Sequence, residues 1–91
     1  MPGAKSSRLK LVYFAWVRER IGLAAEEVEI PVAVATVSDL VGWLTARGPE
    51  YASAFARPEI IRAAIDHTHV KPAASLSGAR EVAFFPPVTG G

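Results

Sequence analysis

One strongly marked helix limits the folds that this 91-residue chain can adopt. Thr36 is a favourable N-cap, and Asp39 stands three residues later, as in a capping box. The apolar residues that follow recur at a helical spacing and so share one face: Val37, Leu40, Val41 and Leu44. Gly48 is expected as the C′ residue, and Pro49 prevents the helix from continuing. We therefore expect one main helix in this chain.

The segments on both sides of this helix alternate between apolar and polar residues, which is the period of a β-strand. Strands are expected over 8–15, 26–30, 60–65, 68–71 and 81–85, and short helical turns over 16–21 and 50–56. Gly22 ends the first of these turns, and Asp66-His67 forms a turn between two strands. This order predicts an α+β domain in which one mixed sheet of about four to five strands packs on one main helix.

A single helix covers only one face of such a sheet, so the other face keeps exposed positions. Phe14 falls on the same side of its strand as Lys10, and Phe85 falls on the side opposite Val82 and Phe84. Exposed aromatic residues tend to mark partner sites, although they also pack under loops. We therefore expect Phe84 in the core and Phe14 and Phe85 at a partner contact.

Charge and cysteine content exclude several functions. The net charge is +1 and the ten basic residues are scattered, so we expect neither a nucleic-acid nor a membrane partner. The chain has no cysteine, which excludes disulfides, thiolate metal sites and thiol nucleophiles. With no apolar run in residues 1–7, this composition favours a cytoplasmic protein. Residues 1–7 are expected to form a disordered lead, 8–85 the domain and 86–91 an extended tail.

The tail has the features of a segment whose terminal carboxylate reacts. Pro86 and Pro87 restrict φ and hold the chain extended beyond the last strand. Gly90 and Gly91 have no side chains that would obstruct an enzyme at the last carbonyl. A Gly-Gly end alone also fits an ordinary flexible terminus. The whole string from Phe84 to Gly91 is much more specific, and we interpret it as a functional tail.

The chain resembles the small subunit of molybdopterin synthase, a family of ubiquitin-like β-grasp sulfur carriers. Three segments carry the resemblance, which covers most of residues 8–91: the tail 84–91, the first strand and its exit 11–19, and the helix start 36–40. The tail is the most specific of the three. The turn before the last strand departs from the family, because Glu81 is its only acidic residue. Asp66 stands where the family often has Asn, and a turn accepts either residue.

The resemblance implies a mechanism and a set of partners. An adenylating enzyme would use ATP to convert the Gly91 carboxylate to a glycyl-adenylate, and a sulfur donor would convert that to a thiocarboxylate. The tail would then enter the large catalytic subunit of a heterotetramer and give sulfur to cyclic pyranopterin monophosphate, forming the dithiolene of molybdopterin. The chain would itself bind no cofactor and no metal. It would be a non-catalytic sulfur-donor subunit, with the catalytic residues on the large subunit.

The expected site residues follow from the tail and the exposed aromatics. Gly91 and Gly90 form the reacting end, and the residues expected to contact partners are Phe14, Arg18, Phe85, Pro86, Pro87, Val88 and Thr89. Without cysteine, no side-chain thiol is available to carry sulfur. Arg18 could meet acidic groups of the large subunit or belong to an ordinary solvated helix face.

Other functions with the same tail chemistry stay open. A sulfur carrier of another pathway, of the thiamine type, would share Gly-Gly, but the Phe-Phe-Pro-Pro segment favours the molybdopterin pathway. A ubiquitin-like modifier would be joined through Gly91 to lysines of other proteins. His67 and His69, spaced to share a strand face, lack a third metal ligand nearby, so we expect a solvated turn and strand. Glu26, Glu27 and Glu29 are interpreted as the solvent-facing side of a strand.

Overall fold

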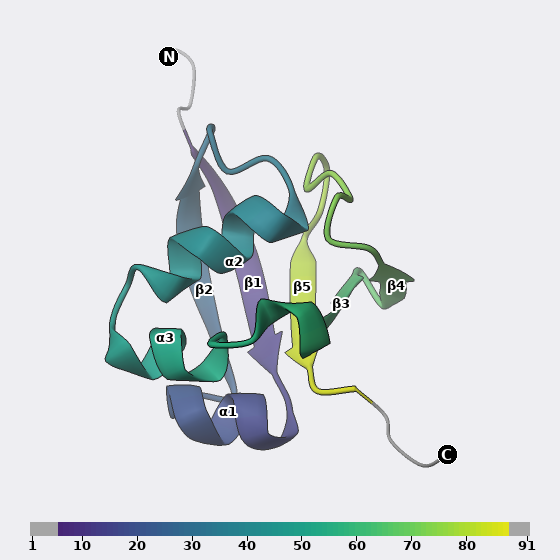
Figure 1. Cartoon of the computed structure of the whole chain (residues 1–91). Coiled ribbons are helices and arrows are strands. Elements are labelled where there is room, and N and C mark those ends of the chain that lie inside the picture. Colours follow the sequence, from purple (N-terminus) through teal and green to yellow (C-terminus); the bar gives the residue numbers. More distant parts are fainter. Residues whose placement is uncertain (1–5, 88–91) are drawn as a thin grey trace.

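The computed structural model describes residues 6–87, which form one mixed five-stranded sheet in the order β2-β1-β5-β3-β4 (Figure 1). The strands are β1 Ser6–Tyr13, β2 Ala25–Pro31, β3 Arg62–Ile65, β4 Thr68–Val70 and β5 Glu81–Phe85. Only the β1–β5 pair is parallel among these strands. The helices are α1 Ala15–Ile21, α2 Val37–Thr45, α3 Pro49–Ala54 and the short 3-10 helix η1 Pro58–Ile60. The predicted α+β class is confirmed.

All three α-helices lie on one side of the sheet (Figure 1). The core between them contains the inward-facing residues of the two central strands, namely Leu9, Leu11, Tyr13, Val82 and Phe84, together with Val37, Leu40 and Leu44 from α2. The helix α2 is the expected main helix, and the helical turns expected over 16–21 and 50–56 are α1 and α3, which extend the helical layer. Among residues 6–87, no helix lies over the opposite face of the sheet, which we call the outer face (Figure 1).

The start of α2 confirms the predicted capping box. The Thr36 hydroxyl accepts a hydrogen bond from the Asp39 N–H at 3.1 Å, and the Asp39 carboxylate accepts one from the Thr36 N–H at 3.2 Å. The prediction for the end of α2 is wrong. The helix ends at Thr45 with Ala46 as C-cap, and Gly48 has an extended backbone and precedes α3 as its N-cap. The cause is Pro49, whose fixed φ and missing N–H suit the first position of a helix.

Several strand boundaries also differ from the sequence expectation. β1 ends at Tyr13 and not at residue 15, β2 extends over Ala25–Pro31, and β4 ends at Val70 and not at residue 71. β1 begins at Ser6, which pairs with Pro31, so the strand starts two residues before the expected position 8. β3 begins at Arg62 and not at residue 60, because Pro58 starts the 3-10 helix η1. By contrast, β5 spans the expected residues 81–85.

The predicted turn at Asp66-His67 is confirmed and has a second role. Both residues have positive φ, 48° and 73°, as required by the tight turn between β3 and β4. One oxygen of the Asp66 carboxylate accepts hydrogen bonds from the backbone N–H groups of Arg80 at 3.1 Å and Glu81 at 2.9 Å. The turn therefore fixes where β5 begins, and β5 in turn determines where the tail leaves the domain.

Candidate functional site

The tail leaves the domain from the middle of the sheet, because β5 pairs with β1 on one side and with β3 on the other. Phe84, the second-last residue of β5, is completely buried. Its ring stacks with that of Tyr13, with 6.3 Å between centroids, and meets the Phe55 ring edge-on at 5.2 Å. These contacts anchor the origin of the tail in the core, as predicted for Phe84.

Phe85 is the last residue of β5 and points to the outer face. It is half-buried, and its ring centroid lies 5.1 Å from that of His69 on β4. Pro86 and Pro87, which follow it, are also half-buried. The predicted site residues Val88, Thr89, Gly90 and Gly91 lie outside the residues that the structure describes. The reacting end therefore stays a prediction, whereas the division between a buried Phe84 and an outer Phe85 is confirmed.

An apolar strip crosses the outer face beside the origin of the tail. Val12 pairs with Ala83, and Ala83 pairs with Ala64, so small side chains lie side by side across β1, β5 and β3. Phe14 is 47% exposed, and its N–H donates to the Phe84 carbonyl at 3.1 Å. The extended pairing of β1 with β5 thus continues to Phe14, and alternation places its side chain on the outer face. We call Val12, Phe14, Ala64, Ala83 and Phe85 the outer strip.

The outer strip has the character of a contact surface. Two aromatic rings stand beside small, flat alanine positions, and aromatics are enriched at protein interfaces. Phe14 is also one of the large hydrophobic side chains that residues 6–87 leave exposed. The structure thus places two of the predicted partner residues, Phe14 and Phe85, on one face beside the origin of the tail.

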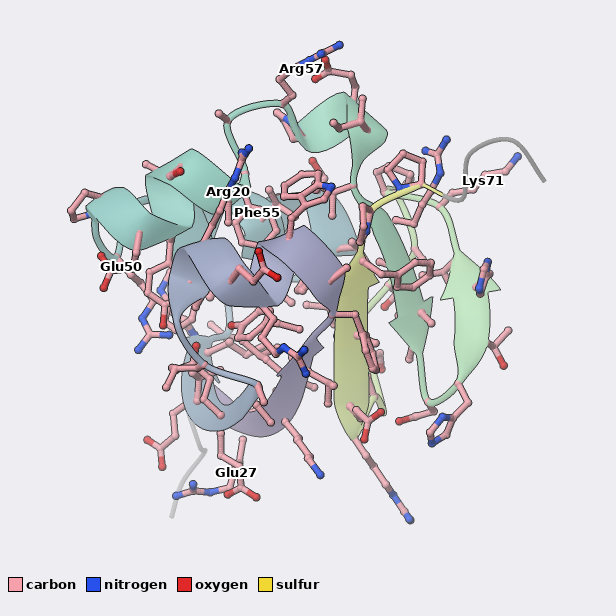
Figure 2. The ribbon with its side chains drawn as sticks, turned by 90° about the horizontal axis from the view of Figure 1, so that it is seen from below. Arg20, Glu27, Glu50, Phe55, Arg57 and Lys71 are labelled. Carbon is pink, nitrogen blue, oxygen red and sulfur yellow. The ribbon has the colours of Figure 1, made fainter. Side chains whose placement is uncertain are left out.

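The two arginines of α1 have different surroundings. Arg20 lies over the Trp16 ring at 4.6 Å and donates a hydrogen bond to the Ser53 carbonyl at 3.2 Å, which ties α1 to α3 (Figure 2). Arg18 is exposed and makes no side-chain hydrogen bond or ion pair with any group in residues 6–87. Arg18 lies one helical turn after Phe14, and its N–H donates to the Phe14 carbonyl at 3.3 Å. A role of Arg18 in partner binding stays a prediction.

A partly buried polar cluster centres on Glu26, which the sequence had indicated to be solvent-facing. Glu26 Oε2 accepts hydrogen bonds from the hydroxyls of Tyr13 and Tyr51, both at 2.7 Å, and Oε1 accepts one from Arg47 at 3.3 Å. The solvent-facing interpretation of Glu26 is wrong, while Glu27 and Glu29 are exposed as expected. Strand alternation could have predicted the inward position of Glu26, because Glu26 lies on the same side of β2 as the buried Val28 and Ile30.

The ionisation of this cluster follows from its surroundings. Burial alone would raise the pKa of the Glu26 carboxyl, but the hydrogen bonds from Tyr51 and Tyr13 and the charge of Arg47 outweigh burial and lower that pKa. Burial, with the hydrogen bond to Glu26, raises the pKa of Tyr51 to about 12 and raises the pKa of Tyr13 as well. At neutral pH the cluster therefore holds one carboxylate, two neutral phenols and one guanidinium. Its role is structural, because it joins β1, β2 and α3.

Metal binding receives no support within residues 6–87. No group of three or more His, Cys, Asp or Glu side chains in this part of the chain is placed to hold a metal ion. His67 lies in the turn with a positive φ and His69 lies on β4, both exposed, which confirms the expected solvated turn and strand. Within the same residues, no helix is both long and apolar enough to cross a membrane.

A cavity of about 720 Å³ lies on the helix side of the sheet. Its lining comes mainly from α2, η1 and the β3–β4 hairpin. Its lining is mainly apolar and includes Val41, Phe55 and Ile61, with Arg62 and Lys71 among the charged residues. The cavity brings together no pair of groups suited to acid–base or nucleophilic chemistry.

The chain was compared with known proteins and structures. Residues 11–91 match the model of the ThiS family. The molybdopterin synthase sulfur carrier subunit of Escherichia coli (strain K12) is 39% identical over 83 residues, which cover 91% of this chain and 99% of that protein. The protein of the same name from Haemophilus influenzae is 34% identical over the same shares of the two chains.

Solved structures confirm the β-grasp fold. The crystal structure of SAMP1 from Haloferax volcanii superposes with a TM-score of 0.69 at 21% identity, covering 93% of this chain and 100% of that one. A putative molybdopterin converting factor, subunit 1, from Pyrococcus furiosus gives a TM-score of 0.67 at 25% identity, covering 89% and 98% of the two chains. The near-complete matches in sequence show that this chain belongs to the ThiS family, in which it is similar to molybdopterin synthase sulfur carrier subunits.

Proposed function

We propose that this chain is the sulfur carrier subunit of a molybdopterin synthase and that it carries sulfur as a thiocarboxylate on Gly91. The observation that carries the proposal is the end of β5, where a buried Phe84 is followed by an outer Phe85 and then by the tail. A domain that anchors the origin of the tail beside a contact surface suits delivery of a side-chain-free terminus to another protein. The similarity to two molybdopterin synthase sulfur carrier subunits supports the choice of pathway.

The chemistry needs two activation steps at the terminal carboxylate. A carboxylate oxygen of Gly91 attacks the α-phosphorus of ATP, pyrophosphate leaves, and an acyl-adenylate forms. Hydrosulfide supplied by a sulfur donor then attacks the carbonyl carbon, AMP leaves, and the terminus becomes a thiocarboxylate. Its sulfur is a soft nucleophile that attacks a side-chain carbon of cyclic pyranopterin monophosphate and displaces an oxygen substituent from that carbon. Hydrolysis of the acyl–sulfur bond then leaves sulfur on the pterin and regenerates the carboxylate. Two such transfers supply both sulfurs of the dithiolene.

The partners follow from this sequence of steps. The adenylating enzyme and the sulfur donor must reach the terminus first, and the large catalytic subunit must accept it afterwards. We assign the outer strip, with Arg18 and Pro86-Pro87, to the contact with the large subunit in a heterotetramer. We place the complex in the cytoplasm, where ATP for the adenylation step is available.

Intact-mass measurement tests the proposal directly. The full chain is incubated with the adenylating enzyme, ATP and a sulfur donor, and we expect a mass gain equal to the replacement of one oxygen by sulfur in the C-terminal peptide. A variant that lacks Gly91 is the matched control and should gain no mass while keeping its fold. An unchanged mass under conditions that charge an established sulfur carrier would reject the sulfur-carrier function.

A carrier of another pathway is the second candidate, because the family model that matches is that of ThiS. The two candidates differ only in the acceptor, which lies outside this chain. Complementation separates them: the chain should restore molybdopterin synthesis, and not thiamine synthesis, in cells that lack their own small carriers. Isopeptide-linked adducts through Gly91 in the same cells would instead indicate a protein modifier.

A further inference from the structure

We propose that Arg62 and Lys71 form a cationic pair beside the origin of the tail and bind carboxylates on the surface of the protein that accepts it. The inference rests on the proposed function, since the accepting protein is the large subunit. It specifies the chemistry of the contact surface on the large subunit, which must present acidic side chains next to an apolar patch.

The sheet register places the two cations next to Phe85. Arg62, the first residue of β3, pairs with Phe85, the last residue of β5, so the two side chains stand on the outer face together. Lys71 directly follows β4, and the neighbouring pair Ala63–Val70 places it opposite Arg62. Figure 2 shows Lys71 on the side of the molecule where the yellow trace leaves β5.

The two charges have no partner within residues 6–87. The ion pairs in this part of the chain join Arg8 to Glu27 and Glu29, Arg47 to Glu26, and Arg57 to Glu59. Glu59 lies in η1, shortly before Arg62 in the chain, and its carboxylate is 3.2 Å from Arg57. Arg62 and Lys71 are both exposed. Positive charge is therefore uncompensated where the tail begins.

The two ends of the outer face differ in the signs of the charges that they carry. At the end of β5 that is far from the tail, Lys10 pairs with both Glu27 and Glu81, so positive and negative groups are mixed there. At the tail end, Arg62 and Lys71 stand beside Phe85 with no carboxylate paired to them in the described residues. A partner with an acidic border on one side of an apolar patch would bind in a single orientation, with the tail directed toward it.

The surroundings favour a protein carboxylate over a phosphate group. A phosphate site gathers converging backbone N–H groups or partly buried donors, whereas Arg62 and Lys71 are exposed side chains at the edge of a flat apolar strip. An apolar centre with a charged border is the usual arrangement of a protein–protein interface. Exposed cations at such a border mainly speed association with a partner of opposite charge.

Association kinetics with the purified large subunit test the pair. The full-length chain, Arg62→Glu, Lys71→Glu and the double variant are compared at several ionic strengths. Arg80→Glu is the matched control, because it makes the same charge change immediately before β5, at the end far from the tail. Arg62→Lys combined with Lys71→Arg keeps both charges and serves as the rescue variant. Thermal unfolding of each variant checks that the domain still folds.

We expect the double variant to associate about tenfold more slowly at low salt and to lose most of the dependence of its rate on salt. Arg80→Glu and the charge-conserving variant should behave like the unmodified chain. Unchanged kinetics in the double variant, with Phe85→Ala still weakening the complex, would overturn the cationic pair and leave the proposed function intact. Unchanged association together with a raised KM for ATP in the adenylation step would assign the pair to phosphate and also overturn the proposal. Failure of the unmodified chain to bind the large subunit would reject the proposed function and this inference with it.

Discussion

The Tyr51 hydroxyl donates a 2.7 Å hydrogen bond to Glu26, which joins helix α3 to the edge strand β2 across 25 positions of sequence. The same carboxylate oxygen accepts the Tyr13 hydroxyl from β1. Tyr13 in turn stacks on Phe84, the residue that anchors the tail. The polar cluster and the origin of the tail are therefore adjacent parts of one packing arrangement, and this leads to the first prediction.

Glu26→Gln should destabilise the domain by about 1–3 kcal/mol. The Glu26 carboxylate accepts hydrogen bonds from several donors, whereas the amide of Gln would turn its own NH₂ donor toward one of them. Urea unfolding followed by circular dichroism measures this change. Glu29→Gln is the matched control on the same strand, where an exposed side chain lies 3.4 Å from Arg8, and its effect should be much smaller. Equal effects of the two substitutions would show that the cluster adds no stability.

Stability should fall in acid through Glu26. The fold lowers the pKa of this carboxyl below its ordinary value of 4.5, so between the two values the unfolded chain binds more protons than the folded one. The contribution is present above the ordinary pKa and disappears as the pH falls through the lowered one. Carboxyls titrate over roughly pH 3 to 6. The difference in unfolding free energy between the unmodified chain and Glu26→Gln should therefore shrink as the pH is lowered through this range. A difference that is constant over this range would contradict the assignment.

Adjacent phenylalanines at the end of β5 should give opposite phenotypes. Phe84→Ala removes a completely buried ring and should cost about 3–5 kcal/mol of stability. Phe85→Ala should leave most of the stability in place and should weaken binding to the large subunit, because this ring stands on the outer face. Denaturant unfolding and titration calorimetry on both variants separate the two effects. Unchanged affinity in Phe85→Ala would reject Phe85 as an interface anchor.

Two glycines should respond to alanine in opposite directions. Gly22 caps α1 with φ at 90°, a conformation that a side chain disfavours, so Gly22→Ala should destabilise by about 1 kcal/mol. Gly42 lies inside α2, and a Cβ built there has no atom within 4 Å, so Gly42→Ala should stabilise by about 0.5–1 kcal/mol. Melting temperatures of the two variants, measured side by side, test both signs. A lower melting temperature for Gly42→Ala would show that the helix needs a glycine there for another reason.

Local chemistry predicted several elements of this fold correctly. The capping box of α2, the turn at Asp66-His67 and the span of β5 each depend on a few neighbouring residues, so their sequence signals were sufficient. The error at Gly48 arose because the same dipeptide, Gly-Pro, can end one helix or begin the next. Which of the two occurs here depends on the packing of Tyr51 and Phe55 against the core.

The amino-acid sequence by itself determined which side chains share a strand side and which terminus is free of side chains, because alternation and backbone freedom are local properties. It could not determine which strands become neighbours. The parallel pairing of β1 with β5 and the antiparallel pairing of β3 with β5 join residues far apart in the chain. These pairings place Arg62 beside Phe85 and bring Tyr51 to Glu26. Only tertiary structure decides such neighbours, because burial of a common core selects one strand order from the many that the same local patterns allow.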